Sequence, residues 1–305
     1  MKAIVQDRYG DTSTLKMIDV SIPETRSSEI QVKIKAVNIS SADMRINTLD
    51  VPFGLTLVIR ILFGWKRPRS IRGITASGII TKVGQEVSKY KVGDKVYFIQ
   101  SLKAGCLAEY KTLNEKDIIA KIPPNMSYEE AAPLAFGAMS SYHFINEHTV
   151  SKGDKVLIYG ASGSLGTYAI QLAKYFGATV TAVSSSKNHA ILSSLGADYV
   201  IDYKINNFWE DEQTYDLIFD AVGKLKKKQV SKVLSQKGKY TSSRRPTKED
   251  VRILQKINEL VSEQKLKTYI EQVYDFEDFK QAHEHVYSKH KVGNVVISFK
   301  KRINQ

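Results

Sequence analysis

The chain is predicted to be an α/β protein that combines a doubly wound parallel sheet with a β-rich domain. Residues 155–187 show strand, glycine turn, helix and second strand in succession. Residues 1–121 carry short alternating segments between turn signals, whereas strands and helices alternate over 122–265. The last segment, 266–305, has the pattern strand, helix, strand and is expected to return to the first domain.

Each part of this assignment rests on local signals. In the first domain, strands are expected at 2–5, 29–36, 78–83 and 95–98. Two prolines at 123–124 mark the boundary. A helix then starts with Ser127 as N-cap and Glu130 three residues on, the spacing of a capping box.

The second domain opens with an apolar strand at 156–159 and a helix with one apolar face, which Gly177 ends. That face holds Leu165, Ala169, Leu172, Ala173 and Phe176. Further strands are expected at 178–183, 199–202, 215–219 and 238–240, and a helix at 248–263.

The turn between the first strand and helix contains Gly160, Gly163 and Gly166. Glycines there let backbone N–H groups approach a pyrophosphate at the helix N-terminus and let the helix pack close to the sheet. The turn therefore predicts a dinucleotide site, and the alternative is a plain crossover without a ligand.

The residues after the second strand select the cofactor. NAD-binding units usually place a carboxylate there, yet no acidic residue lies between Gly166 and Asp198. Ser184, Ser185 and Lys187 suit a 2′-phosphate instead, so the sequence favours NADPH over NADH. The alternative for Lys187 is a solvated lysine in the first turn of the next helix.

Composition excludes several classes of protein. The net charge of +13 is spread along 305 residues, and no zinc finger, RNP motif or helix-turn-helix signature is present, so nucleic acid is not expected as a partner. The single cysteine, Cys106, excludes an intramolecular disulfide and is expected to be buried. The N-terminus lacks a signal-peptide core, and the most apolar stretch, 55–65, is too short to span a bilayer, so a cytoplasmic protein without a membrane partner is expected.

A set of short motifs, in this order and spacing, resembles the medium-chain dehydrogenase/reductase superfamily, and within it the zinc-free quinone oxidoreductase (zeta-crystallin-like) group. The resemblance covers nearly the whole chain. The motifs lie at 1–4, 9–10, 78–84, 92–96, 108–110, 130–132, 156–163, 171–174, 195–198, 201–203, 219–223 and 293–299.

The resemblance implies a GroES-like catalytic domain, formed by both ends of the chain, and a Rossmann domain, with the cofactor in the cleft between them. It places Tyr203 beside the 2′-phosphate and Ser140 on the nicotinamide side, although Ser140 equally fits a helix hydroxyl that bonds its own backbone. The predicted cofactor-binding residues are Ser140, Gly160, Ser162, Gly163, Ser164, Leu165, Gly166, Ser184, Ser185, Lys187, Tyr203, Val222 and Gly223.

Zinc-dependent members resemble this chain but carry a cysteine where it has Ser40 and a histidine where it has Ile74. Catalytic zinc needs about three side-chain ligands from Cys, His or carboxylates. The sequence therefore predicts no metal. Ser40, Asp43 and Tyr142 are the candidate catalytic residues, with Tyr9 as a further possible proton donor; Asp43 fits a loop-capping carboxylate equally well, and both tyrosines fit packed aromatics.

Without zinc, the expected reaction is hydride transfer from NADPH to a small hydrophobic electrophile, a quinone or an α,β-unsaturated carbonyl. Residues 55–65 are either a substrate-side flap or a helix packed on the first domain. Residues 241–247 are shorter than in relatives, where that region often carries a strand used in dimerisation, which weighs against a homodimer. The alternative is a catalytically weak NADPH-sensing or nucleic-acid-binding relative.

Overall fold

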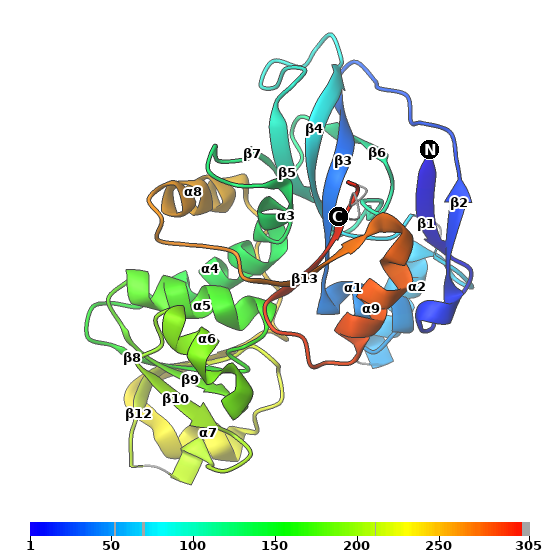
Figure 1. Ribbon diagram of the computed structural model, residues 1–305. Helices are drawn as coiled ribbons and strands as arrows, with labels where there is room; N and C mark the ends of the chain where they lie inside the picture. Colours follow the sequence, from blue (N-terminus) through cyan, green and yellow to red (C-terminus); the bar gives the residue numbers. More distant parts are fainter. Residues whose placement is uncertain (52, 69–70, 211, 301–305) are drawn as a thin grey trace, which may run out of the picture. The chain divides into compact units, whose positions relative to one another are not determined.

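The computed structural model describes residues 1–51, 53–68, 71–210 and 212–300. The chain forms two compact units (Figure 1). Unit 1 consists of Met1–Phe136 together with the segment from Ile270 onwards, and unit 2 is Gly137–Tyr269. The sequence analysis places the boundaries after residues 121 and 265. The helix at 128–131 lies with unit 1 because Tyr128 and Ala132 pack against Ala36 and Val296.

Unit 1 is built on a seven-stranded sheet in which the end of the chain pairs with its beginning. Strand β14 lies antiparallel to β3, with Val295 opposite Ile39. The sheet order is β13 (Ile270–Asp275), β14 (Asn294–Ser298), β3 (Glu29–Ile39), β4 (Thr75–Val83), β5 (Lys95–Ile99) and β7 (Ile119–Lys121), and β6 (Tyr110–Asn114) also pairs with β3. Strands β1 (Lys2–Gln6) and β2 (Leu15–Asp19) form a separate hairpin.

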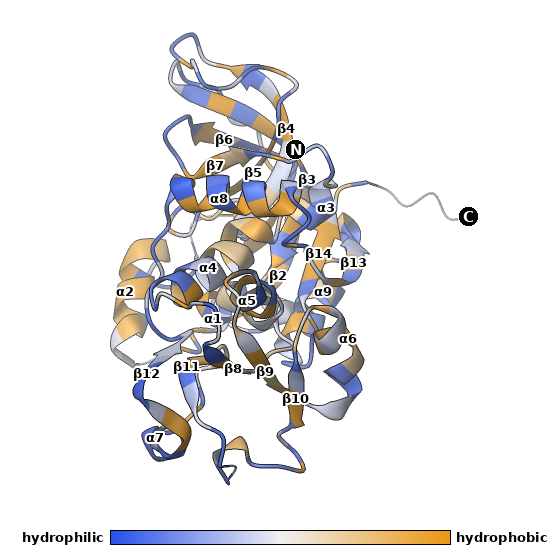
Figure 2. Ribbon diagram, turned by 90° about the vertical axis from the view of Figure 1, so that its left-hand side faces the viewer, coloured by the Kyte–Doolittle hydropathy of each residue, from blue (hydrophilic) through white to orange (hydrophobic). Residues whose placement is uncertain are grey.

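The helices of unit 1 cover this sheet and its loops. They are α1 (Ser41–Thr48), α2 (Phe53–Phe63), α3 (Tyr128–Ala131) and α9 (Phe279–Tyr287), with 3₁₀ turns at Thr12–Thr14 (η1) and Phe276–Asp278 (η5) and a π-helical turn at Leu134–Ala138 (η2). The capping box of α3 is confirmed, since Ser127 Oγ accepts from Glu130 N and the Glu130 carboxylate accepts from Ser127 N. Figure 2 shows α2 as a helix that is hydrophobic along nearly all its length.

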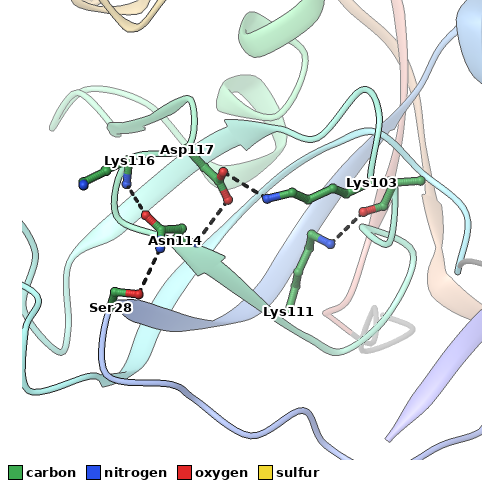
Figure 3. Close-up of polar contacts among 7 residues, drawn as sticks. Ser28, Lys103, Lys111, Asn114, Lys116 and Asp117 are labelled. Carbon is green, nitrogen blue, oxygen red and sulfur yellow. Dashed lines mark hydrogen bonds and ion pairs between the residues drawn. The ribbon is translucent and has the colours of Figure 1, made fainter. Parts of the chain in front are cut away.

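The loop between β5 and β6 is braced by two lysines (Figure 3). The ammonium of Lys111 donates to the carbonyl oxygen of Ala104 at 2.7 Å, and Lys103 pairs with Asp117 at 3.3 Å. Burial lowers the pKa of Lys111. Asn114, the last residue of β6, donates from Nδ2 to Ser28 Oγ at 3.0 Å.

Unit 2 is built on a five-stranded sheet whose strands are all parallel. The order is β10 (Tyr199–Asp202), β9 (Thr179–Ser184), β8 (Lys155–Tyr159), β11 (Tyr215–Asp220) and β12 (Leu234–Ser242). From β8 the chain first adds β9 and β10 on one side and then crosses over to add β11 and β12 on the other side. In such sheets ligands bind at the carboxyl ends of the strands where the direction reverses, which here is between β8 and β11.

Helices cover both faces of this sheet, as alternation along β11 shows. Phe219 packs on Phe144 with ring centroids 5.0 Å apart, whereas Ile218 points into the opposite core. The helices of unit 2 are α4 (Met139–Asn146), α5 (Ser164–Tyr175), α6 (His189–Ser194), α7 (Lys227–Val233) and α8 (Val251–Ser262), with 3₁₀ turns at Ser186–Asn188 (η3) and Phe208–Glu210 (η4).

The strand and helix pattern expected from the sequence is confirmed, with one revision. Helix α5 is buried on nearly every side rather than on one face, since Thr167, Tyr168 and Gln171 are buried as well. The reason is that α4 packs on it, and Gln171 also bonds the backbone of Lys267. No helix in the described residues is long and apolar enough to cross a membrane.

Replacement of Phe219 by Ala should lower the free energy of unfolding by about 3–5 kcal/mol, because it empties a fully buried site. Urea denaturation followed by circular dichroism measures the change. The matched control is Ile205→Ala, at a side chain that is 77% exposed, where a change within about 0.5 kcal/mol is expected. Equal losses at both positions would contradict the assigned core.

Candidate functional site

The turn after β8 requires two of its three glycines for purely structural reasons. Gly160 has φ +76°, and a Cβ there would come within 2.2 Å of Val222 Cγ2. A Cβ on Gly166 would lie 2.4 Å from the carbonyl oxygen of Ala161. These contacts bring the start of α5 directly against the turn, at the carboxyl end of the central strand.

Gly163 is different. Its φ of −75° and ψ of 174° suit any residue, and the nearest atom to a Cβ would be Gly160 O at 3.5 Å. Nothing in the protein demands glycine there, so a side chain would only fill the space in front of the helix. Gly163 is the N-cap of α5, a twelve-residue helix whose first N–H groups and dipole favour an anion. A phosphate group fits this cradle, which Ser162, Ser164 and Leu165 flank, each of them half-buried.

A second group of predicted residues gathers where β9 and β10 end. Asn188 Nδ2 donates to Ser184 Oγ at 3.1 Å and to Ser185 Oγ at 3.3 Å. Lys187 is exposed beside them. Tyr203 lies at the same edge, 48% exposed, and its N–H donates to Ser184 O.

The sequence analysis missed a carboxylate at this edge. Asp202 is buried, and its oxygens accept from Ser186 N at 2.9 Å and Lys204 N at 2.8 Å. The hydrogen bond from Lys204 N, with that from Ser186 N, lowers the pKa of Asp202, so the group is ionised. Both oxygens are thus held by backbone amides. A signal for it was present in the sequence. The sequence analysis looked for a carboxylate after β9, whereas Asp202 is the last residue of the next strand, β10.

The end of β11 is organised by a fully buried carboxylate. Asp220 Oδ1 accepts from Val222 N at 3.1 Å and Gly223 N at 2.7 Å, and Oδ2 accepts from Leu225 N at 2.8 Å. Gly223 has φ +77°, and a Cβ there would lie 2.7 Å from Arg244 Cγ. The turn that carries Val222 and Gly223 therefore has a fixed shape next to the glycine turn.

Helix α4 holds the remaining candidates of unit 2. The interpretation of Ser140 as a hydroxyl bonded to its own backbone is wrong: its Oγ is buried and has no hydrogen-bond partner in the described part of the chain. Ser141 makes such a bond instead, to Gly137 O at 2.8 Å, and a second to Leu165 O.

Tyr142 is not near the glycine turn. Its ring packs on Phe176, with centroids 6.3 Å apart, just beyond the C-terminal end of α5. Burial raises its pKa. The placement fits a packed aromatic, and among the described residues of unit 2 no hydrogen bond links its hydroxyl to the glycine turn. The hydroxyl of Tyr9 is engaged in unit 1, where it donates to Gly64 O at 2.8 Å.

Ser40 and Asp43, both buried in unit 1, form a capping box at the start of α1. Ser40 Oγ donates to Asp43 Oδ2 at 2.6 Å, Ser40 N donates to the same oxygen at 2.9 Å, and Asp43 N donates to Ser40 Oγ. Burial raises the pKa of Asp43, whereas the Ser40 hydrogen bonds and the Arg72 charge oppose the rise. The structure therefore gives Asp43 the loop-capping role.

Sequence reasoning missed the buried polar cluster beside this cap. The Arg72 guanidinium bonds Asn47 Oδ1, and Asn47 Nδ2 donates to the Tyr287 hydroxyl at 3.2 Å. The ring of Tyr287 contacts that of His283. Asn47 lies in α1, Arg72 lies just before β4, and His283 and Tyr287 lie in α9. They are far apart in the sequence, so only the fold brings them together.

Two further polar residues lie on adjacent strands of the same unit. Asn38 and Thr75 face each other in the β3–β4 register, and both are buried. Asn38 Oδ1 and Nδ2 and Thr75 Oγ1 have no hydrogen-bond partner among the described residues. Unpartnered polar atoms of this kind are unusual in a core and are typical of sites that bind a ligand or water.

In the described residues, no group of three or more His, Cys, Asp and Glu side chains could hold a metal ion. Ile74 lies in an apolar cluster with Phe63 and Ala104. Cys106 is fully buried, and burial raises the pKa of its thiol to about 12, so it is protonated at neutral pH.

Known families account for both units. Residues 26–155 match the alcohol dehydrogenase GroES-like domain, and residues 164–288 match the zinc-binding dehydrogenase family. The fold is thus a GroES-like domain with a Rossmann-like domain. The chain belongs to the medium-chain dehydrogenase/reductase superfamily, in its quinone oxidoreductase-like group.

Individual relatives agree with this assignment. The 2-methylene-furan-3-one reductase of Solanum lycopersicum is 32% identical over 73% of the chain and 57% of the relative. The chloroplastic NADPH-dependent alkenal/one oxidoreductase of Arabidopsis thaliana is 28% identical over 97% of the chain and 79% of the relative. The quinone oxidoreductase structure from Coxiella burnetii superposes with a TM-score of 0.84 at 27% identity, covering 98% of this chain and 99% of that one. The chain thus spans little more than half of the tomato relative.

Substitutions at two glycines of the turn should affect different properties, one the binding of a dinucleotide and the other the stability of the fold. Gly163→Ala should leave the unfolding midpoint almost unchanged but weaken binding of a dinucleotide by about tenfold or more, because the methyl group occupies the phosphate space. Gly166→Ala should destabilise the fold by about 1–3 kcal/mol through its clash with Ala161 O. Thermal unfolding and NADPH titration of both variants test this. Unchanged binding by Gly163→Ala would contradict the cradle.

His283 should make unit 1 sensitive to acid. Its Nδ1 lies 2.7 Å from Phe279 O, Nε2 has no partner among the described residues, and burial lowers its pKa from 6.5 to about 4. Between these values the unfolded chain binds a proton that the folded chain does not. Stability is therefore complete above pH 6.5 and falls by about 3 kcal/mol as the pH drops to 4.

Denaturation at several pH values measures this loss. His283→Gln should flatten the dependence between pH 6.5 and 4, whereas His290→Gln, at an exposed position, should leave it as in the native chain. Identical slopes in all three proteins would show that other groups cause the acid sensitivity.

Proposed function

We propose that the chain is an NADPH-dependent oxidoreductase that transfers hydride, without zinc, to a quinone or an α,β-unsaturated carbonyl compound. The observation that carries the proposal is Gly163, an ordinary backbone conformation kept free of a side chain at the N-terminus of α5. The names of relatives support the acceptor class, since they include an alkenal/one oxidoreductase and a quinone oxidoreductase.

The preference for NADPH is supported by the edge formed by β9 and β10. A 2′-phosphate needs cations and hydroxyl groups, which Lys187, Ser184 and Ser185 supply. A ribose-binding carboxylate would favour NADH, but both oxygens of Asp202 are already bonded to backbone amides. Tyr203, half-exposed at this edge, offers its ring as a wall beside the adenosine.

The cofactor supplies a hydride at nicotinamide C4, and the protein's residues bind and orient. Ser140 offers a hydroxyl without a partner on the described chain. In unit 1, Ser40 and Asp43 shape the start of α1, and Asn38 and Thr75 offer unpartnered polar atoms for the acceptor oxygen. With the cofactor bound, a quinone would gain that hydride and one proton from water and become a hydroquinone.

Zinc independence rests on the donor set. Ser40 and Ile74 stand where zinc-dependent relatives carry their cysteine and histidine, and Ile74 is packed among apolar side chains. A quinone or a conjugated carbonyl is already electrophilic and does not need a Lewis acid for reduction. A cytoplasmic location and the absence of a nucleic-acid partner remain predictions.

The first test is titration with NADPH and NADH, followed by NADPH oxidation with 1,4-benzoquinone and with a 2-alkenal. Tight NADPH binding with turnover of either acceptor is the expected result. Binding without turnover would favour the NADPH-sensing alternative, and no binding of either cofactor would overturn the proposal.

Lys187→Glu tests the cofactor preference directly. The new carboxylate should repel the 2′-phosphate and raise the Kd for NADPH at least about tenfold, with less than about a twofold change for NADH. Lys226→Glu is the matched control, since it changes the same charge at an exposed position on another turn. A similar loss in both variants would mean that general charge, rather than Lys187, attracts the cofactor.

A further inference from the structure

Helix α2 is hydrophobic along most of its length (Figure 2), and together with the residue pair after it, it exposes several large apolar side chains. Six side chains are involved: Leu55 is 50% exposed, Leu57 52%, Val58 45%, Ile61 65%, Leu62 56% and Trp65 56%. Isolated exposed apolar residues need no explanation, but a contiguous group of this kind marks an interaction site.

This face is exposed although the helix itself is firmly attached. Phe63 is buried, and Ile59 packs with Ile46 and Ala42 of α1. At the C-terminal end, Arg60 Nη1 donates to Trp65 O at 2.6 Å, and its guanidinium lies over the ring of Tyr9, 5.5 Å from the centroid. The inner face and the end of α2 are thus fixed, so its outer face has a defined direction.

The outer face carries no charge. Leu55, Val58 and Leu62 follow one another at helical spacing, and Leu57 and Ile61 lie in the adjacent row. A surface helix of a globular protein normally places polar residues there. With eleven residues, α2 is too short to cross a bilayer, but it is long enough to lie in a membrane surface.

The charges around α2 indicate what covers it. Residues 51–68 contain no Asp or Glu, but they contain Arg60, Lys66 and Arg67. Lys66 and Arg67 are exposed directly after Trp65. An apolar helix face with a tryptophan and cations at its end is the combination that binds the interface of an anionic bilayer. The net charge of +13 adds long-range attraction.

A second copy of the chain is a poorer occupant. A two-fold interface would bring two copies of the same patch together, each with Lys66 and Arg67 and with no acidic residue within 51–68 to pair with them. Repulsion between these cations opposes such a dimer, whereas anionic lipid headgroups would neutralise them.

We propose that α2 lays its outer face in the surface of an anionic lipid bilayer, so that unit 1 is bound peripherally to a membrane. The sequence analysis expected no membrane partner because the apolar stretch at 55–65 is too short to span one. That argument excludes a spanning helix and leaves a surface-bound one. The proposal does not depend on the reaction that the protein catalyses.

The test is co-sedimentation of the full chain with vesicles of phosphatidylcholine, alone or mixed with phosphatidylglycerol. Binding is expected only to the mixed vesicles and should weaken as the salt concentration rises. Trp209 is the other tryptophan and is packed in the core of unit 2. In a Trp209→Phe background, Trp65 emission should therefore shift to the blue when the vesicles are added.

Two independent variants locate the contact. Leu57→Ser with Ile61→Ser removes apolar area, and Lys66→Glu with Arg67→Glu reverses the neighbouring charge; each pair should weaken vesicle binding by more than about tenfold. The matched controls are Ile205→Ser, at another exposed apolar residue, and Lys227→Glu with Lys228→Glu, which changes the net charge equally. Both controls should bind as the native chain does.

Three results would overturn the proposal. Native protein that fails to bind mixed vesicles at low salt would exclude membrane docking. Equal loss in the lysine control would show diffuse charge attraction rather than docking by α2. A dimer in light scattering that Leu57→Ser with Ile61→Ser makes monomeric, without vesicle binding, would assign the face to self-association. Circular dichroism of each variant confirms that it is folded.

Discussion

The close approach of Gly166 to the carbonyl of Ala161 in unit 2 fixes where α5 begins relative to the glycine turn. Because no side chain separates them, α5 starts directly above the end of β8. The first N–H groups of the helix then point to the edge at which β9, β10 and β11 also end. Serine hydroxyls, a lysine and two tight turns gather there as a consequence of strand order.

Buried carboxylates give this edge and unit 1 their rigidity. Asp202 and Asp220 each accept backbone N–H groups of the turn that follows their strand, and Asp43 does the same at the start of α1. Backbone hydrogen bonds of this kind hold the loop next to each carboxylate in one conformation. At this edge the carboxylates hold the turns, whereas Lys187 and Lys204 are exposed there.

The fold could be predicted well from the sequence because its signals are local. The glycine turn, the apolar strand at 156–159 and the capping box at Ser127 depend on neighbours in the chain. The distribution of burial around α5 could not be predicted, since it depends on how α4 packs. For the same reason the cluster of Asn47, Arg72 and His283 was missed: its members are far apart in sequence and meet only through packing.

The candidate site was predicted in part, for a related reason. Residue type and spacing predicted the glycine turn before α5 and the serines and lysine after β9, but not the direction in which each side chain points. Tyr142 illustrates the difference, because a helix of twelve residues separates its ring from the glycine turn. Asp202 is the opposite case: it was not predicted to lie at this edge, but the pairing of β10 with β9 places it opposite Ser184.

The lysine contact in unit 1 closes a loop with the chain's own groups. Lys111 holds the Ala104 carbonyl from within the chain, and the only cysteine nearby, Cys106, is sealed in the core with its thiol protonated. A loop closed by an ammonium and a carbonyl group needs no metal delivery and no thiol chemistry. The contact that closes this loop therefore depends on neither a supply of metal ions nor the redox state of the surroundings.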